Sequence, residues 1–127
     1  MKSIKVFCPG SVANISCGFD ILGLCLDNVG DEIIVTQTKK KGIELEVFGD
    51  YVVTKNINKN AASVSALALL KSFKPIDFGF HISVNKKIKP GSGIGSSAAS
   101  SAGSVFAINE LLDLSLIHIS EPTRHLL

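Results

Sequence analysis

Tryptophan is absent from the 127-residue sequence, tyrosine and methionine occur once each, and aromatic residues make up only 6% of the chain. RNA-binding domains usually combine aromatic side chains with a strongly basic surface, yet the formal net charge here is +2. Charged residues are scarce at 19%, whereas 46% of residues are hydrophobic. We therefore expect a folded domain, or part of one, that binds no nucleic acid.

Long apolar runs and paired cysteines are also missing. No stretch of 18 apolar residues is present, so we expect no membrane span or membrane partner. The first ten residues, MKSIKVFCPG, lack the apolar core of a secretory signal. The three cysteines form no Cys-x-x-Cys pair, which argues against a zinc site and a disulfide framework. We interpret Cys8, Cys17 and Cys25 as small apolar fillers and expect a cytoplasmic protein.

Several segments alternate between apolar and polar residues or are continuously apolar, as β-strands do. We predict strands at residues 3–9, 19–27, 31–38, 43–49 and 78–88. Pro9 and Gly10 are expected to end the first strand, because proline lacks the amide hydrogen that a central strand needs. The segment 19–27 is apolar enough for a buried strand.

Two segments have the composition and spacing of helices. The first covers residues 60–73, with Asn60 as a candidate N-cap and Pro75 just beyond its end. The second begins at Ser96 or Ser97 and runs to about residue 112. The order of strands, helix, strand, glycine-rich loop and helix predicts a layered α+β domain.

The glycine-rich loop lies in the stretch KPGSGIGSSAASSAG, residues 89–103, between the last predicted strand and the second helix. The first amides of a helix and the positive end of its dipole attract anions. Gly91, Gly93 and Gly95 allow the backbone to approach a phosphate without a Cβ in the way. Ser96 and Ser97 add hydroxyls that suit phosphate oxygens or Mg²⁺. The loop therefore predicts a phosphate site, and a plain flexible turn is the alternative.

The loop differs from two common nucleotide motifs. No Gly-Lys-Ser/Thr closes it, which excludes a Walker A loop, and the pattern fits the dinucleotide fingerprint poorly. Residues 90–99, PGSGIGSSAA, closely resemble the phosphate loop of the GHMP small-molecule kinases.

A second motif narrows this resemblance. Residues 9–27, PGSVANISCGFDILGLCLD, are similar to the N-terminal motif of the homoserine kinases within that superfamily. The matching positions are Ser11, Ala13, Asn14, Gly18, Phe19, Asp20 and Gly23. Cys17 departs from the pattern, since the family often has proline there. Two motifs in the right order make the resemblance specific, and it covers residues 2 to about 113.

The resemblance implies transfer of the ATP γ-phosphoryl group to the side-chain hydroxyl of L-homoserine, on the pathway to threonine. It also implies the GHMP kinase N-terminal fold, a mixed sheet with helices on one face and a left-handed β-α-β unit. ATP and Mg²⁺ would then be required. No general base is evident in the sequence.

Site residues follow from the resemblance position by position. Asn14 and Asp20 match substrate-binding positions, and Asp20 could orient the homoserine hydroxyl or bind its ammonium group. Ser97 matches a Mg²⁺-ligand position and is, with Asp20, a candidate catalytic residue. Asn60 is a candidate for contact with the nucleotide base or a plain N-cap. The expected ATP-binding residues are Pro90, Gly91, Ser92, Gly93, Ile94, Gly95, Ser96, Ser97, Ala98, Ala99 and Ser100.

Three further interpretations complete the sequence-based hypothesis. GHMP kinases are about twice as long as this chain, so it resembles an N-terminal fragment that would be inactive without its C-terminal domain. The full-length enzyme is expected to be a homodimer. A non-catalytic nucleotide- or anion-binding module, a different GHMP kinase and an RNA-binding domain remain alternatives. His81 lies on a predicted strand and is interpreted as structural.

The last segment, LSLIHISEPTRHLL at residues 114–127, has a different character from the helix before it. Helix formers up to Asp113 give way to β-branched residues, histidines and Pro122. Residues 114–124 resemble one reading frame of a transposase-type sequencing-library adapter, whose codons spell the same residues at every position. We therefore interpret 1–113 as the domain and 114–127 as a non-native tail.

Overall fold

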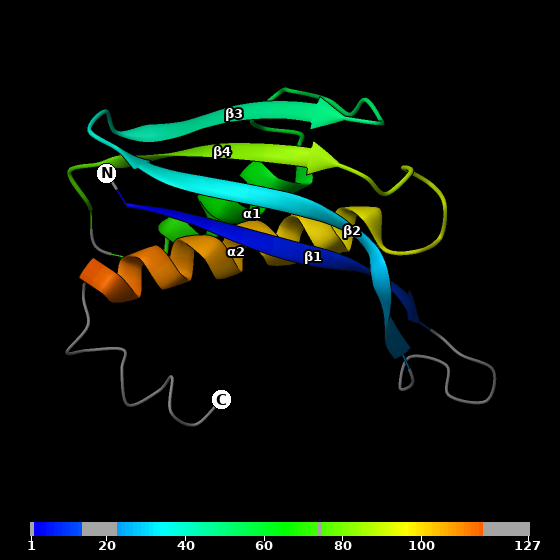
Figure 1. Ribbon diagram of the computed structural model, residues 1–127. Coiled ribbons are helices and arrows are strands. Elements are labelled where there is room, and N and C mark those ends of the chain that lie inside the picture. Colours follow the sequence, from blue (N-terminus) through cyan, green and yellow to red (C-terminus); the bar gives the residue numbers. More distant parts are fainter. Residues whose placement is uncertain (1, 14–22, 74, 116–127) are drawn as a thin grey trace.

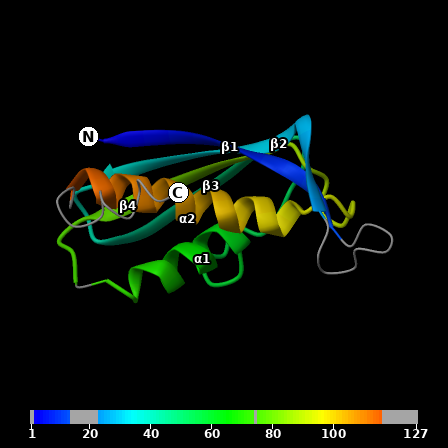
Figure 2. The same ribbon diagram turned by 90° about the horizontal axis from the view of Figure 1, so that it is seen from below.

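The structure is a computed structural model that describes residues 2–13, 23–73 and 75–115. Four strands form one sheet, and two helices lie together on one of its faces (Figures 1 and 2). In chain order the elements are β1 (Ser3–Ala13), β2 (Gly23–Thr38), β3 (Gly42–Gly49), α1 (Ala61–Leu70), β4 (Gly79–Lys86) and α2 (Ser96–Ser115). This is the α+β arrangement of sheet and helices that the sequence predicted. No helix in these described ranges has both the length and the apolar character to cross a membrane.

The strands are arranged in the order β1-β2-β4-β3. β2 pairs antiparallel with both β1 and β4, whereas β3 pairs parallel with β4, so the sheet is mixed. β4 is therefore a central strand, and its even-numbered residues Phe80, Ile82 and Val84 are fully buried. β3 is an edge strand whose Ile43 and Val47 face the core, as its period-two pattern predicted.

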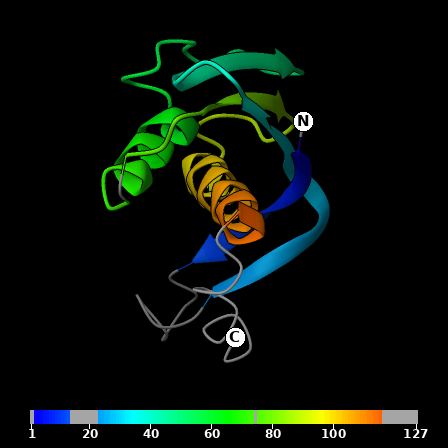
Figure 3. The ribbon, with the colours of Figure 1, turned by 90° about the vertical axis from the view of Figure 1, so that its left-hand side faces the viewer.

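The connection from β3 through α1 to β4 is a crossover between parallel strands. In Figure 3 the N-terminal ends of both strands face the viewer, and the path runs from β3 at the top, through α1 on the left, to β4 beneath β3. This counterclockwise path makes the crossover left-handed, as the family resemblance implied. About 98% of such connections are right-handed, so the handedness is a distinctive feature of the fold.

The first strand is longer than predicted. Pro9 and Gly10 do not end it, because pairing with β2 resumes at Ser11 after a register shift. β1 is an edge strand, where a missing amide hydrogen is tolerated, and a bulge absorbs the irregularity. The prediction of a strand end at Pro9 was therefore wrong.

The strands predicted at 19–27 and 31–38 are parts of a single strand, β2. Residues 19–22 of the first prediction lie outside the described residues. Residues 26–29 of β2 lie opposite Gly10 alone, so the strand bulges there. Asn28 has φ 60°, a left-handed conformation that asparagine adopts more readily than most residues. Leu24 is 49% exposed, and Asp27 and Val29 are also exposed, so the expected buried strand was wrong for this segment.

Both predicted helices are confirmed. The Asn60 side chain accepts a hydrogen bond from the Ala62 amide at 2.9 Å and so caps α1. α2 begins at Ser96 and packs between α1 and the curved pair β1 and β2 (Figure 3). The Ser104 hydroxyl of α2 donates to the Ala62 carbonyl of α1 at 2.9 Å, which fixes one helix against the other.

Candidate phosphate-binding site

The segment between β4 and α2, which we call the phosphate loop (residues 89–95), has a backbone that depends on its glycines. Gly91, Gly93 and Gly95 have φ values of +78°, +83° and +78°. Other residues seldom adopt this left-handed conformation without strain. The loop ends at Ser96, where α2 begins, and the Ala99 amide donates to the Gly95 carbonyl at 2.8 Å as the first bond of that helix.

The phosphate loop is fixed to the first strand at the β1 bulge. The Ser11 amide donates to the Ile94 carbonyl at 2.8 Å. A Cβ at Gly95 would lie 2.6 Å from the Ser11 hydroxyl oxygen, and one at Gly10 would lie 3.2 Å from the Ile94 carbonyl oxygen. Glycine at position 95 is therefore favoured by both its φ and this contact, whereas a Cβ at position 10 would be tight but would need only a small shift.

A pocket of about 190 Å³ lies between the phosphate loop and the beginning of α1. Its lining includes Asn60, Lys86, Gly91, Ser96, Ser97 and Ser100. The N-terminal turns of α1 and α2 both border it, and Lys59 and Lys86 add cationic side chains. Helix N-termini and lysines carry positive charge, so the pocket suits an anion.

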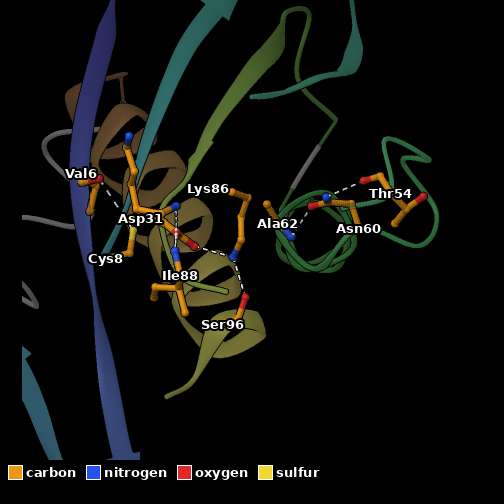
Figure 4. A network of polar contacts seen from close by, with 10 residues as sticks. Val6, Cys8, Asp31, Thr54, Asn60, Ala62, Lys86, Ile88 and Ser96 are labelled. Carbon is orange, nitrogen blue, oxygen red and sulfur yellow. Dashed lines mark hydrogen bonds and ion pairs between the residues drawn. The ribbon is translucent and has the colours of Figure 1, made fainter. Parts of the chain in front are cut away.

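A buried ion pair lies behind this pocket (Figure 4). The Lys86 Nζ donates to Asp31 Oδ2 at 2.6 Å and to Ser96 Oγ at 2.6 Å. Asp31 Oδ1 accepts from the amides of Lys87 at 2.7 Å and Ile88 at 2.9 Å. Asp31 is 0% exposed and Lys86 1% exposed, so these charges are held by one another and by the backbone rather than by water.

Sequence reasoning did not identify Asp31 and Lys86. Side chains alternate between the two faces of a strand, and both residues lie on the face that points to the core. In β2, Asp31 alternates with the buried Ile33 and Val35, and in β4, Lys86 alternates with the buried Ile82 and Val84. They lie one position beyond the last cross-strand pair, Glu32 with Asn85. The signal in the sequence was an aspartate and a lysine at positions where the alternation of their strands predicts a buried side chain. This signal indicates an ion pair only once β2 and β4 are known to be neighbours.

The predicted site residues have different outcomes. Asn14 and Asp20 lie outside the described residues. Asn60 caps α1, and its Nδ2 donates to the Thr54 carbonyl at 2.8 Å, so its side chain has a structural role whether or not it also touches a base.

Ser97 is exposed in the first turn of α2. His81 lies on the outer face, with Nδ1 3.4 Å from Glu44 Oε2.

The alanines after the phosphate loop differ in their surroundings. Ala99 and Ser100 are buried, whereas Ala98 and Ala102 are exposed and line a separate apolar groove between α2 and β1. Small residues at the start of a helix allow it to lie close to a neighbouring strand. Gly103 has this effect, because a Cβ on it would overlap the Cys8 sulfur of β1.

The cysteines are not all core fillers. Cys8 is buried, and burial, together with the nearby Asp31 charge, raises the pKa of its thiol from 9.0 to about 11, against the opposing effect of Lys86. Cys25 is exposed, so the interpretation as a filler was wrong for it. Cys17 lies outside the described residues.

Comparison with known proteins gives the family. The family model described as the GHMP kinases N terminal domain matches residues 53–122. The homoserine kinase of Methanococcus maripaludis strain S2 is 46% identical over 118 residues, covering 91% of this chain and 38% of that protein. The chain thus spans less than two-fifths of the length of this relative.

Solved structures agree with this assignment. The crystal structure of homoserine kinase from Cytophaga hutchinsonii superimposes with a TM-score of 0.79 at 46% identity, covering 88% of this chain and 36% of that one. A 4-(cytidine 5'-diphospho)-2C-methyl-D-erythritol kinase, at 18% identity, shares the fold with a TM-score of 0.62 and covers 85% of this chain and 40% of its own. Because the family model covers more than half of the chain, and because the fold agrees, this chain belongs to the GHMP kinase family, whose N-terminal domain it carries.

Proposed function

We propose that the full-length protein carrying this segment transfers the γ-phosphoryl group of ATP to the side-chain hydroxyl of L-homoserine. The observation that carries the proposal is the phosphate loop with its three left-handed glycines, in a chain 46% identical to homoserine kinases. This segment would supply the nucleotide-phosphate site and, at Asn14 and Asp20, part of the homoserine site.

The described residues contribute position and charge to the reaction. Phosphoryl transfer spreads negative charge over the phosphate oxygens in the transition state, and groups fixed beforehand stabilise it best. The amides of the phosphate loop and the first turn of α2 bind those oxygens, whereas the Lys86 charge in the pocket wall is balanced by Asp31. Ser96 and Ser97 supply hydroxyls at the same helix end.

Mg²⁺ fits this site only in part. Ser97 offers one exposed oxygen ligand, whereas Mg²⁺ in kinases is normally also held by a carboxylate. Both oxygens of Asp31, the carboxylate hydrogen-bonded behind Ser96, are already engaged. Among the residues that the structure describes, no cluster of three acidic, histidine or cysteine side chains could hold a metal. Mg²⁺ bound with ATP would neutralise phosphate charge, and Ser97 would be one of its ligands.

Asn14 and Asp20 are proposed to bind homoserine. This assignment is supported by the motif at residues 9–27, because a carboxylate matches the ammonium and hydroxyl groups of the substrate. Replacing Asp20→Asn in the full-length protein is expected to weaken homoserine binding by about 10- to 150-fold, corresponding to roughly 1.5–3 kcal/mol. ATP binding should change far less. Equal losses for both substrates would mean that Asp20 is structural.

The experiment that tests the proposed activity measures ADP release by the full-length protein with ATP and Mg²⁺. Release is expected to depend on L-homoserine, and the phosphorylated product should be detectable by mass spectrometry. Release with a different alcohol in place of homoserine would indicate another GHMP kinase. ATP binding without turnover on any acceptor would indicate a binding module and overturn the proposal.

We further propose that this activity belongs to cytoplasmic threonine biosynthesis and that the full-length enzyme is a homodimer. The support is the family resemblance and the similarity to homoserine kinases. Light scattering on the full-length protein measures its mass, and a monomer at micromolar concentration would contradict the dimer.

A further inference from the structure

We infer that Asp31 is a positioning residue that fixes both ends of the phosphate loop, an inference that rests on the proposed nucleotide site. Asp31 is fully buried at the neck of the loop and is not among the residues that line the pocket. It therefore acts on the nucleotide only through the groups that it holds.

The first end of the loop is held through the backbone. β4 ends at Lys86, and the next two amides, those of Lys87 and Ile88, both donate to Asp31 Oδ1. These residues have left the sheet, where the strand ladder would have satisfied their amides. One carboxylate oxygen thus sets the direction in which the chain enters the loop (Figure 4).

The second end is held through Lys86. Asp31 Oδ2 accepts from the Lys86 Nζ, and the same ammonium donates to the hydroxyl oxygen of Ser96 at 2.6 Å. Ser96 is the first residue of α2, directly after the loop. The entry and the exit of the loop are therefore linked to a single side chain of β2, 55 positions before Lys86 in the sequence.

The link also sets the direction of the Ser96 hydroxyl. An ammonium group has only hydrogen-bond donors, so Ser96 Oγ must accept from Lys86. Its own hydrogen is then free to donate, and a phosphate oxygen in the adjoining pocket is a suitable acceptor. Asp31 holds Lys86 in place and thereby presents Ser96 as a donor to an anion, while Ser97 remains for the metal.

Energetics agree with a positioning role. Burying two charges costs about as much as their attraction returns, so such pairs seldom add net stability. Losing one partner is costly because the other charge stays buried, whereas replacing both by neutral groups is often tolerated. This difference separates stability from positioning in an experiment.

The decisive variant is the double replacement Asp31→Asn with Lys86→Met in the full-length protein, which leaves no unpaired charge. We expect it to fold, and we expect its ATP affinity, measured by direct titration, to fall by about 10- to 100-fold because Ser96 at the exit of the loop loses its link to β2. The homoserine KM should stay within about twofold. Amide hydrogen exchange over residues 89–97 should be faster than in the wild type.

The conservative variant Asp31→Glu keeps the negative charge, and it tests the positioning role of Asp31 if the double variant does not fold. It is expected to weaken ATP binding by a smaller factor of about 3 to 10, because an extra methylene group shifts the contacts without removing them. ATP affinity within twofold of wild type in either folded variant would overturn the inference. Since titration needs no acceptor, this result is independent of whether homoserine is the substrate.

Asp50→Asn is the matched control. Asp50 also pairs with a lysine beside the loop, Lys87, at 3.4 Å, but both side chains are largely exposed. Exposed pairs contribute little, so this variant should leave ATP affinity and loop exchange unchanged. An effect as large as that of the double variant would show that any lost negative charge near the loop suffices, and would contradict a specific role for Asp31.

Discussion

At Gly95 the backbone has φ +78°, and a Cβ would lie 2.6 Å from the Ser11 hydroxyl oxygen. Valine is β-branched and poorly suited to this conformation. Gly95→Val is therefore expected to displace the phosphate loop from β1 and to abolish detectable ATP binding in the full-length protein. Isothermal titration with ATP and Mg²⁺ measures this, and unchanged affinity would contradict the assignment of the loop.

Gly42→Val provides the matched control for Gly95→Val. Gly42 has φ +104° at the beginning of β3, and a Cβ there would meet nothing within 4 Å. The backbone strain, about 1–3 kcal/mol, is similar, but the position is remote from the pocket. The control should lower stability and retain ATP binding. Loss of binding in both variants would mean that strain alone explains the effect.

Cys8 allows a test of burial through its pKa. Only the thiolate reacts with alkylating reagents, and raising the pKa from 9.0 to about 11 lowers the thiolate fraction at pH 8 by about 100-fold. Iodoacetamide should therefore modify native Cys8 at least ~100-fold more slowly than urea-unfolded Cys8, with the rate rising toward pH 11. Peptide mass mapping separates Cys8 from the exposed Cys25. Equal rates in native and unfolded protein would show that Cys8 is accessible.

The residues that the sequence identified are those whose role is local. Gly91, Gly93 and Gly95 stand in a motif, and Asn60 stands directly before a helix, so both were visible in short windows. Asp31 and Lys86 act across 55 positions, and their partnership depends on the pairing of β2 with β4. Local patterns do not contain this information, and a lone aspartate after a glycine resembles an ordinary turn residue.

Among the elements, α2 approaches β1 closely at Gly103. A Cβ at Gly103 would overlap the Cys8 sulfur and lie 3.0 Å from Ile33 Cδ1. Gly103→Ala should therefore destabilise the protein by about 1–3 kcal/mol through overpacking. This effect opposes the helix preference of alanine, which alone would stabilise by about 1 kcal/mol. Urea unfolding of the full-length protein measures the difference.

A second substitution identifies the contact responsible. Cys8→Ala removes the sulfur that the new methyl group would meet, so the double variant Cys8→Ala with Gly103→Ala should be more stable than the sum of the two single effects predicts. Additive effects would mean that α2 moves as a whole and that the contact with Cys8 is not limiting.

Element boundaries show where pattern reasoning fails for the strands. Pro9 and the sequence around Asn28 looked like chain breaks, but both lie at bulges in the β1–β2 pair. An edge strand tolerates a proline, and a strongly curved strand needs irregular residues. The helices were predicted more accurately because Asn60 and Ser96 mark their beginnings in the sequence itself.

On the scale of the whole molecule, one side of the domain is apolar. Phe7 and Phe106 are 52% and 54% exposed and border the groove between β1 and α2. The homoserine kinases that this chain resembles are much longer, with 38% of their length covered in the case of the Methanococcus maripaludis protein. We expect the 127-residue chain alone to bind the dye ANS and the full-length protein not to bind it. Strong dye binding by both would mean that this groove stays open.

The segment 114–127 bears on where the domain ends. The family model matches as far as residue 122, and α2 continues to Ser115, whereas the resemblance to a sequencing adapter begins at Leu114. The family model therefore includes residues 114–122 in the domain, whereas the resemblance to an adapter excludes them from it. If the adapter reading is right, His118 and His125 have no bearing on catalysis, and the net charge is unaffected because the tail holds one glutamate and one arginine.

Amplifying the locus from source DNA and reading past codon 113 decides between the two. We expect a continuing GHMP kinase frame with helix-forming residues in place of LSLIHISEPTR, because the matched part covers only 38% of the Methanococcus maripaludis relative. Finding those eleven residues encoded in the genome would show that the tail is natural.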